Sequence, residues 1–143
     1  MANPPDIADT DRIALAMIDC TLPKAQWTHE AHLRTGLWHA MRYPDAEALA
    51  LLRTRIRVYN EATGVMNTDT DGYHETITRL YVHLIGRFVR DADRSRPIDA
   101  LAADLIRDLG DRELPLTYYS RERLLSKAAR HAWLEPDRAE LPA

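Results

Sequence analysis

Cysteine, glycine and phenylalanine are scarce in this sequence, which has one cysteine, Cys20, five glycines and one phenylalanine among 143 residues. A single thiol excludes an internal disulfide framework and every zinc site built on two or four thiolates. Any metal must therefore be held mainly by His, Asp or Glu. The few glycines, none adjacent to another, and the long stretches of Ala, Leu, Arg, Asp and Glu favour helices over a sheet.

An excess of basic charge is also missing, because 19 Lys and Arg are intermixed with 22 Asp and Glu, for a formal net charge of −3. Such a chain has little with which to neutralise a row of phosphates, so we expect no nucleic-acid partner. No apolar run approaches the ~20 residues of a membrane span, and residues 1–12 lack the order of a signal peptide. We therefore expect no membrane partner and a cytoplasmic location.

The chain does contain enough apolar material for a core, since 45% of its residues are hydrophobic. Its length predicts one domain over residues 1–143, with loose termini at about 1–8 and 136–143. Helical spacing of apolar residues, N-caps such as Thr28 and Ser120, and the stops at prolines and glycines predict six helices. These cover about residues 9–20, 28–43, 45–63, 73–91, 97–109 and 120–135.

Short connectors between these segments favour antiparallel neighbours, which predicts an all-α fold: an up-and-down helical bundle of four main helices plus one or two additional helices. In that topology the second, fourth and sixth helices start at the same end. His29, His32 and His74 lie in the first turns of two of them. We expect these three imidazoles to meet at the mouth of the bundle, although on a helical wheel His32 falls at the border of the apolar face.

Three imidazoles and a water form the open site expected of a catalytic metal. Side chains three apart, such as His29 and His32, are neighbours on a helix, and the positive end of a helix favours the neutral rings that metals require. The sequence thus predicts a divalent transition metal, with Zn, Ni and Fe equally suited to imidazole. The HExxH signature of zinc proteases is not met, because the two histidines are three apart.

Glu30 and Glu75 each follow one of these histidines at a helix start, where a stabilising effect on the helix end is the alternative to a functional role. The wheel turns Glu30 toward the apolar face and Glu75 away from it. We therefore interpret Glu30 as the acid that takes a proton from metal-bound water. Among the aromatic residues near this end, Tyr81 and Tyr119 are expected to line the pocket, while a role at the rim of the core remains the alternative.

The segment between the third and fourth helices, NTDTDG, matches the start of a calcium loop. The match breaks where the twelfth position is Thr78 and not a glutamate. A turn that caps the following helix is the main interpretation, and a weak cation site is the alternative.

The segments WTHEAHL, NTDTDGYHETIT and YYSRERLLSKAAR resemble those of a small group of uncharacterised bacterial all-helical proteins, and the likeness covers Trp27 to Asp137. It implies no activity. At the level of the fold, the pattern is also similar to the DinB-like metal-binding bundles, which hold a divalent metal with three histidines. That family pairs its histidines as HxxxH on the later helix, whereas here the pair stands on the earlier one.

Two hypotheses from different classes follow. The first is a metal-binding bundle that performs metal-assisted hydrolysis or group transfer on a small polar molecule. The second is a non-enzymatic bundle that binds a small-molecule ligand or a partner subunit and uses its histidines structurally. A homodimer is expected because the apolar faces exceed what four helices need.

Overall fold

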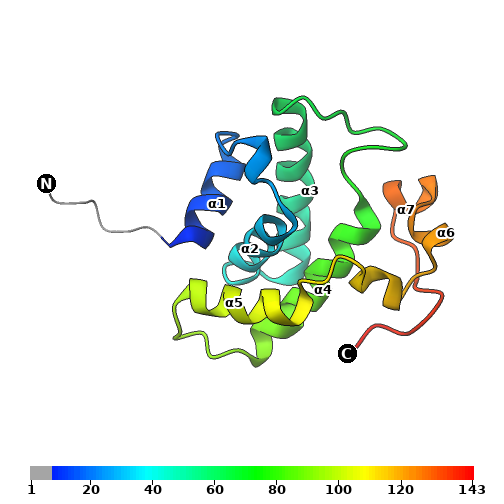
Figure 1. Ribbon diagram of the computed structural model, residues 1–143. Coiled ribbons are helices and arrows are strands. Elements are labelled where there is room, and N and C mark those ends of the chain that lie inside the picture. The colour runs from blue at the N-terminus through cyan, green and yellow to red at the C-terminus, as the bar shows by residue number, and fades with distance from the viewer. Residues whose placement is uncertain (1–7) are drawn as a thin grey trace, which may run out of the picture.

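A computed structural model describes residues 8–143 of the chain (Figure 1). Residues 1–7 of the N-terminal segment, which the sequence predicts to be loose, lie outside the described residues. The fold is an all-α helical bundle, as the composition predicted, with no strand in residues 8–143. Its long helices are α1 (Asp9–Ile18), α2 (His29–Ala40), α3 (Asp45–Ala62), α4 (Glu75–Asp91) and α5 (Ile98–Leu109), followed by the short helices α6 (Arg121–Leu124) and α7 (Lys127–His131).

Helix α2 is the centre of the bundle, because it packs against α1, α3, α4 and α5 (Figure 1). Its start is fixed as predicted: the Thr28 hydroxyl accepts a hydrogen bond from the backbone N–H of Ala31 at 3.2 Å. Since other helices surround it, residues on several of its sides are buried, including Leu33, Leu37 and His39. The assumption of a single apolar stripe, used in the wheel above, does not hold for this helix.

The largest part of the core lies between α2, α4 and α5, where Leu37, Ile85, Leu101 and Leu105 are buried. A second cluster on the other side of α4 is formed with the C-terminal residues. A third cluster joins α1 to α3. The first cluster fixes α2 and α4 side by side, and this pair of helices positions the site described below.

The predicted sixth helix is wrong in extent, because the chain breaks at Ser126 into α6 and α7. Ser126 is extended, with ψ 153°, and its hydroxyl accepts a hydrogen bond from the backbone N–H of Ala129. The residue therefore caps a new helix instead of continuing the old one. Ser120 caps α6 as predicted, through Arg123 N–H.

The C-terminal segment, expected to be loose, is bound along α4 and the end of the domain. Asp137 accepts hydrogen bonds from the backbone N–H and the hydroxyl of Ser120. His83 contacts the carbonyl oxygen of Pro142 at 2.6 Å. Leu141 packs against the second core cluster. These contacts make residues 136–143 part of the described domain.

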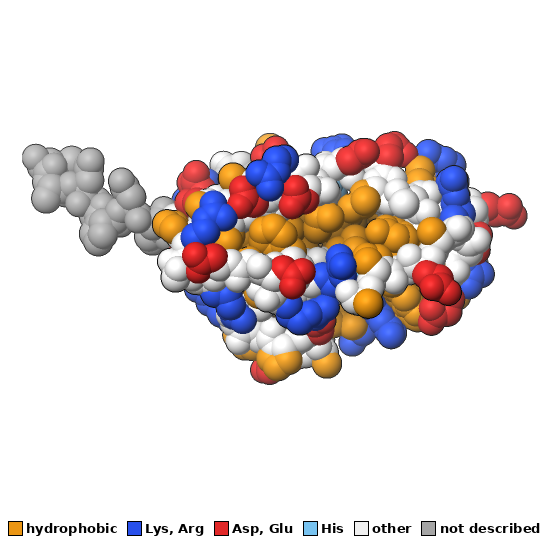
Figure 2. All heavy atoms as spheres, turned by 90° about the horizontal axis from the view of Figure 1, so that it is seen from below, with side chains coloured by type: hydrophobic (Ala, Val, Ile, Leu, Met, Phe, Trp, Pro, Cys, Tyr) orange, Lys and Arg blue, Asp and Glu red, His pale blue; other side chains and the backbone are white. Residues whose placement is uncertain are grey.

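No helix in residues 8–143 is both long enough and apolar enough to cross a membrane. The face seen in Figure 2 carries a band of hydrophobic side chains, and acidic and basic side chains are interspersed on both of its borders. The two signs of charge are therefore mixed on this face, in keeping with the balanced composition.

Candidate binding cavity

A cavity of about 370 Å³ lies between α2, α3 and α4 and is closed on one side by the loop that leads into α4. That volume falls in the range of ordinary small-molecule pockets. Its wall is mainly apolar, and no Asp, Glu, Lys or Arg is among its lining residues in the described part of the chain. The polar or aromatic members of the wall are Trp27, His29, His32, Thr35, Asn60, Tyr73, His74, Thr78 and Tyr81.

The three predicted histidines and Tyr81 all line this cavity. The topology thus brings His29, His32 and His74 to one space, as their positions at two helix starts indicated. They do not form a coordination group: within residues 8–143, no three His, Cys, Asp or Glu side chains are arranged to hold a metal ion.

The His74 side chain shows why, because both of its ring nitrogens are already bonded. Nδ1 accepts from the backbone N–H of Ile77 at 3.1 Å, so the imidazole is the N-cap of α4. Nε2 lies 2.8 Å from the carbonyl oxygen of Leu124 and donates to it. Desolvation, opposed by this backbone bond, lowers the pKa of His74 and keeps the ring neutral. A ring held in this way has no lone pair left for a metal.

The His32 side chain is the opposite case. No hydrogen bond contributes to its ionisation, and desolvation is the first of the effects that lower its pKa to about 4. The residue as a whole is nevertheless exposed, and it lines the cavity. Its ring is therefore surrounded by protein atoms and is still accessible to a ligand in the cavity. The ring of Trp27 meets it edge-on, with centroids 3.9 Å apart and planes at 86°.

Other polar atoms of the cavity wall also lack partners. His29 Nε2, Thr35 Oγ1 and the Tyr81 hydroxyl are buried atoms without a hydrogen bond among residues 8–143. The rings of His29 and Tyr81 meet at 71°, with centroids 5.8 Å apart. Desolvation lowers the pKa of His29, and burial raises the pKa of Tyr81 to about 12. Both side chains are therefore neutral near pH 7.

Glu75 does not line the cavity, but it binds Tyr73, which does. Its carboxylate accepts two hydrogen bonds from the Arg53 guanidinium, at 2.8 and 2.6 Å, and one from the Tyr73 hydroxyl at 2.8 Å. Hydrogen bonding to Arg53 is the main reason why the pKa of Glu75 is lowered. The pair joins α3 to the start of α4 and orients the Tyr73 ring on the cavity wall.

Two predicted placements are corrected by the structure. Glu30 is exposed and does not line the cavity. The wheel failed here because α2 is enclosed by helices on several sides. Tyr119 is fully buried on another side of α4, where its hydroxyl donates to the Leu134 carbonyl oxygen at 2.6 Å. It packs with Leu80 in the second core cluster and not on the cavity wall.

The loop over the cavity, residues 65–74, is organised by Asn67. Its Oδ1 accepts hydrogen bonds from the backbone N–H of Tyr73 at 2.9 Å and from the Asn60 amide at 3.1 Å. Its Nδ2 donates to the carbonyl oxygen of Arg57. Gly72 has φ +81°, and a Cβ there would lie 2.6 Å from Asn67 Oδ1. One asparagine thus ties both ends of the loop to α3.

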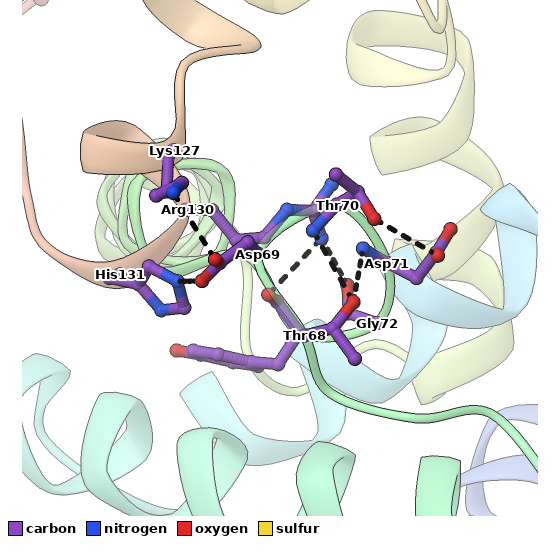
Figure 3. A network of polar contacts seen from close by, with 9 residues as sticks. Thr68, Asp69, Thr70, Asp71, Gly72, Lys127, Arg130 and His131 are labelled. Carbon is purple, nitrogen blue, oxygen red and sulfur yellow. Dashed lines mark hydrogen bonds and ion pairs between the residues drawn. The ribbon is translucent and has the colours of Figure 1, made fainter.

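The tip of this loop is held by α7 (Figure 3). Asp69 lies 2.7 Å from His131 Nε2 and 3.3 Å from Lys127 Nζ. Arg130 donates to the Gly72 carbonyl oxygen at 2.9 Å. The Asp71 carboxylate is directed instead to the Thr70 hydroxyl. The two acids of the calcium-like motif therefore have separate partners, in keeping with the interpretation of this segment as a structural turn.

A second hollow, of about 490 Å³, lies between α4 and α5 and has charged walls. Four of its charged side chains are paired with each other: Asp104 accepts from Arg96 at 2.6 Å and from Arg107 at 3.2 Å, and Arg107 also contacts Asp108. Exposed pairs of this kind stabilise a helix surface only slightly.

The sequence missed several residues that shape the cavity. Thr35 and Asn60 line it, but each stands among helical residues with no motif around it. Glu75, which the wheel turned away from the apolar face, is buried and holds Tyr73 on the cavity wall. His74 as an N-cap had a local signal, since it immediately precedes the helical residues. Histidine is not among the usual N-caps, which hid that signal.

Neither a protein-family model, nor a curated protein, nor a solved structure was found to match this chain. The site is therefore interpreted from its own geometry.

Proposed function

We propose that this protein binds a small, mainly apolar organic molecule in the cavity between α2, α3 and α4. The observation that carries the proposal is a cavity of about 370 Å³ whose lining includes no charged Asp, Glu, Lys or Arg but does include polar atoms without partners. Apolar walls with a few unsatisfied polar groups are the ordinary composition of a ligand pocket. This corresponds to the non-enzymatic alternative drawn from the sequence.

Unpaired polar atoms inside a protein are destabilising, so their concentration at one place calls for an explanation. Of the five such side-chain atoms within residues 8–143, three belong to residues of this cavity: His29, Thr35 and Tyr81. The other two are Asp11 Oδ1, which lies 3.7 Å from an Arg42 guanidinium nitrogen, and Trp38 Nε1. Other buried polar side chains of residues 8–143, such as His39 and Glu75, are paired. A bound molecule would supply partners in the cavity and recover part of that lost free energy.

Binding of N-phenylnaphthylamine, an uncharged apolar fluorophore, tests the proposal. We expect a saturable rise in its fluorescence at one equivalent per chain. Val82 lines the cavity, so Val82→Phe fills it and should weaken binding at least tenfold. Val58 lies on α3 outside the cavity and is 50% exposed, so Val58→Phe should bind as the original protein does. Equal binding by both variants contradicts the proposal.

Metal binding by His29 and His32 is the second candidate function. What favours it is the placement of two neutral imidazoles, three residues apart, on the wall of one cavity. His74 does not fit the predicted three-histidine site, because both of its nitrogens are bonded to backbone groups. We therefore derive no hydrolytic or transfer step through a metal.

Titration with Zn, Ni and Fe separates the two candidates. If metal is held by the α2 pair, one equivalent raises the melting temperature, and His32→Phe abolishes the rise while His83→Phe does not. If the cavity takes an organic molecule, the fluorophore binds equally well with and without a chelator. The predicted homodimer is checked in the same samples by sedimentation, since the apolar band in Figure 2 is the surface that it would cover.

A further inference from the structure

We propose that the cavity is specific for an uncharged, planar heteroaromatic molecule that donates an N–H or O–H hydrogen bond to the imidazole of His32. This inference rests on the proposed binding function and names the chemical class of its ligand. It depends on the shape of the wall, its lack of charge and the unpaired state of one ring.

The preference for a planar ligand follows from the aromatic and imidazole rings of the cavity wall. Six of the lining residues carry aromatic or imidazole rings. Trp27 meets His32 edge-on and Tyr81 meets His29 edge-on, which leaves ring faces and edges for a flat guest. Aromatic groups prefer such offset and edge-to-face contacts with another aromatic ring. A planar molecule thus makes more favourable contacts here than a branched aliphatic molecule of equal volume.

The requirement for an uncharged ligand follows from the absence of a counter-ion. No acidic or basic side chain among the described residues lines the cavity. A charged molecule would leave water without an oppositely charged partner, which carries a large desolvation penalty. The guanidinium of Arg112 is near enough to contribute to the lowered pKa values of His29 and His32, but its side chain is exposed and does not line the wall. Its charge is therefore solvated.

The hydrogen bond follows from His32. A neutral imidazole has one nitrogen that donates and one that accepts, and neither has a partner among the described residues. The ring is open to the cavity, unlike the buried nitrogen of His29. A ligand that covers the His32 ring removes it from water, so a ligand without a donor leaves the acceptor nitrogen unpaired and is disfavoured relative to a ligand that carries one.

Calorimetry with four indole derivatives tests these three requirements. Indole is flat, uncharged and carries an N–H; N-methylindole lacks the donor, indoleacetate is an anion and tryptamine is a cation. We expect indole to bind, N-methylindole to bind about tenfold more weakly, and both charged derivatives to bind at least tenfold more weakly than indole. Equal affinities for indole and N-methylindole, or tighter binding of a charged derivative, would overturn the proposal.

The role of His32 is isolated by the variant His32→Phe, which keeps a ring and removes both nitrogens. In this variant the ratio of the indole and N-methylindole affinities should fall from about ten to about one. The control is Glu30→Gln on the same helix, which is exposed outside the cavity and should keep the ratio. An unchanged ratio in His32→Phe contradicts the assignment.

A measurement on the unsubstituted protein guards against a variant that does not fold. The ring nitrogen resonances of His32 should shift when indole is added and stay in place with N-methylindole. If they respond equally to both, the hydrogen bond is wrong. Failure of all four indoles together with N-phenylnaphthylamine overturns the binding function itself, whereas binding of the fluorophore without discrimination among indoles overturns only the present inference.

Discussion

The start of α4 and the cavity wall of α2 both carry polar side chains at or beside the cavity, but they differ in how those side chains are paired. At the start of α4, His74 uses both ring nitrogens and Glu75 accepts three hydrogen bonds. On α2, His32 has no hydrogen-bond partner among residues 8–143, and the Thr35 hydroxyl is unsatisfied there too. The comparison separates polar groups that hold the fold together from polar groups that are available to a ligand.

The distinction matters because residue type alone would have treated all of these histidines alike. Fully paired polar groups contribute to stability, and removing one leaves its partners unsatisfied. Unpaired ones contribute little or are unfavourable. Substitutions at the start of α4 should therefore change stability, and substitutions on the cavity wall of α2 should change binding.

The largest effect is expected at the buried acid of α4. Glu75→Ala leaves the Arg53 guanidinium and the Tyr73 hydroxyl without their partner, and we expect a loss of about 3 kcal/mol in the free energy of unfolding. This is at the low end for a broken buried pair, because the Arg53 side chain is 40% exposed and can turn to water. Urea denaturation measures it. Glu30→Ala, in the first turn of α2, is the matched control and should change stability little.

A smaller loss is expected for the histidine that caps α4. His74→Ala removes the cap on Ile77 N–H and the bond to the Leu124 carbonyl oxygen, for about 2 kcal/mol in total. His74→Asn, which restores a cap, should recover about half of this. His32→Ala should leave the free energy of unfolding nearly unchanged while it weakens binding of indole. Comparable destabilisation by the two alanine variants would refute the contrast between the two helices.

The pH dependence of stability extends the comparison to a third histidine, His39, which is fully buried and paired. Its Nδ1 lies 2.8 Å from the Thr35 carbonyl oxygen, and its Nε2 lies 2.9 Å from Arg55 NH1. Desolvation lowers its pKa from 6.5 to about 4. Between those two values the unfolded chain binds a proton that the folded chain excludes.

The free energy of unfolding therefore falls as pH drops from 6.5 toward 4, by at most about 1.4 kcal/mol per pH unit for this one residue. Above pH 6.5 the ring is neutral in both states, and its contribution does not vary. Denaturation curves at several pH values measure this slope. The slope should be shallower in His39→Gln, and an identical slope in that variant would show that His39 does not titrate as its surroundings indicate.

The smallest effect is expected at the surface contact between the cavity loop and α7. Asp69→Asn weakens the pairing with His131 and Lys127, so the amide protons of residues 65–74 should exchange faster while those of α4 keep their protection. Asp71→Asn removes only a contact with the Thr70 hydroxyl and should exchange as the original protein does. Hydrogen exchange followed by mass spectrometry distinguishes the two variants.

Much of the fold was predictable from local sequence. Apolar spacing, the Thr28 cap and the stops near Pro44 and Gly110 located the five long helices to within a few residues, because these signals act within one or two turns. The break at Ser126 was not predicted, because a serine that caps a helix and a serine within a helix look alike until its neighbours are placed.

The candidate site was predictable only in part. The position of His29, His32 and His74 at two helix starts correctly indicated that they share one space. Which of them is free to bind depended on groups far away in the chain, such as the Leu124 carbonyl oxygen that engages His74. The wheel misplaced Glu30 because it assumed one buried face for a helix that has neighbours on several sides. No sequence motif specifies the distant hydrogen-bond partners of a side chain or the number of helices that pack around α2.

One feature of the central helix pair has a practical meaning for redesign. At Gly36, one turn beyond His32, an added Cβ would lie 2.6 Å from Cδ1 of Ile85 on α4. The spacing of the two helix backbones, and with it the depth of the hollow beside them, is thus set by one missing methyl group. Trimming Ile85 to Val alongside Gly36→Ala offers a route to a resized receptor for other guests, with the rest of the scaffold kept as it is.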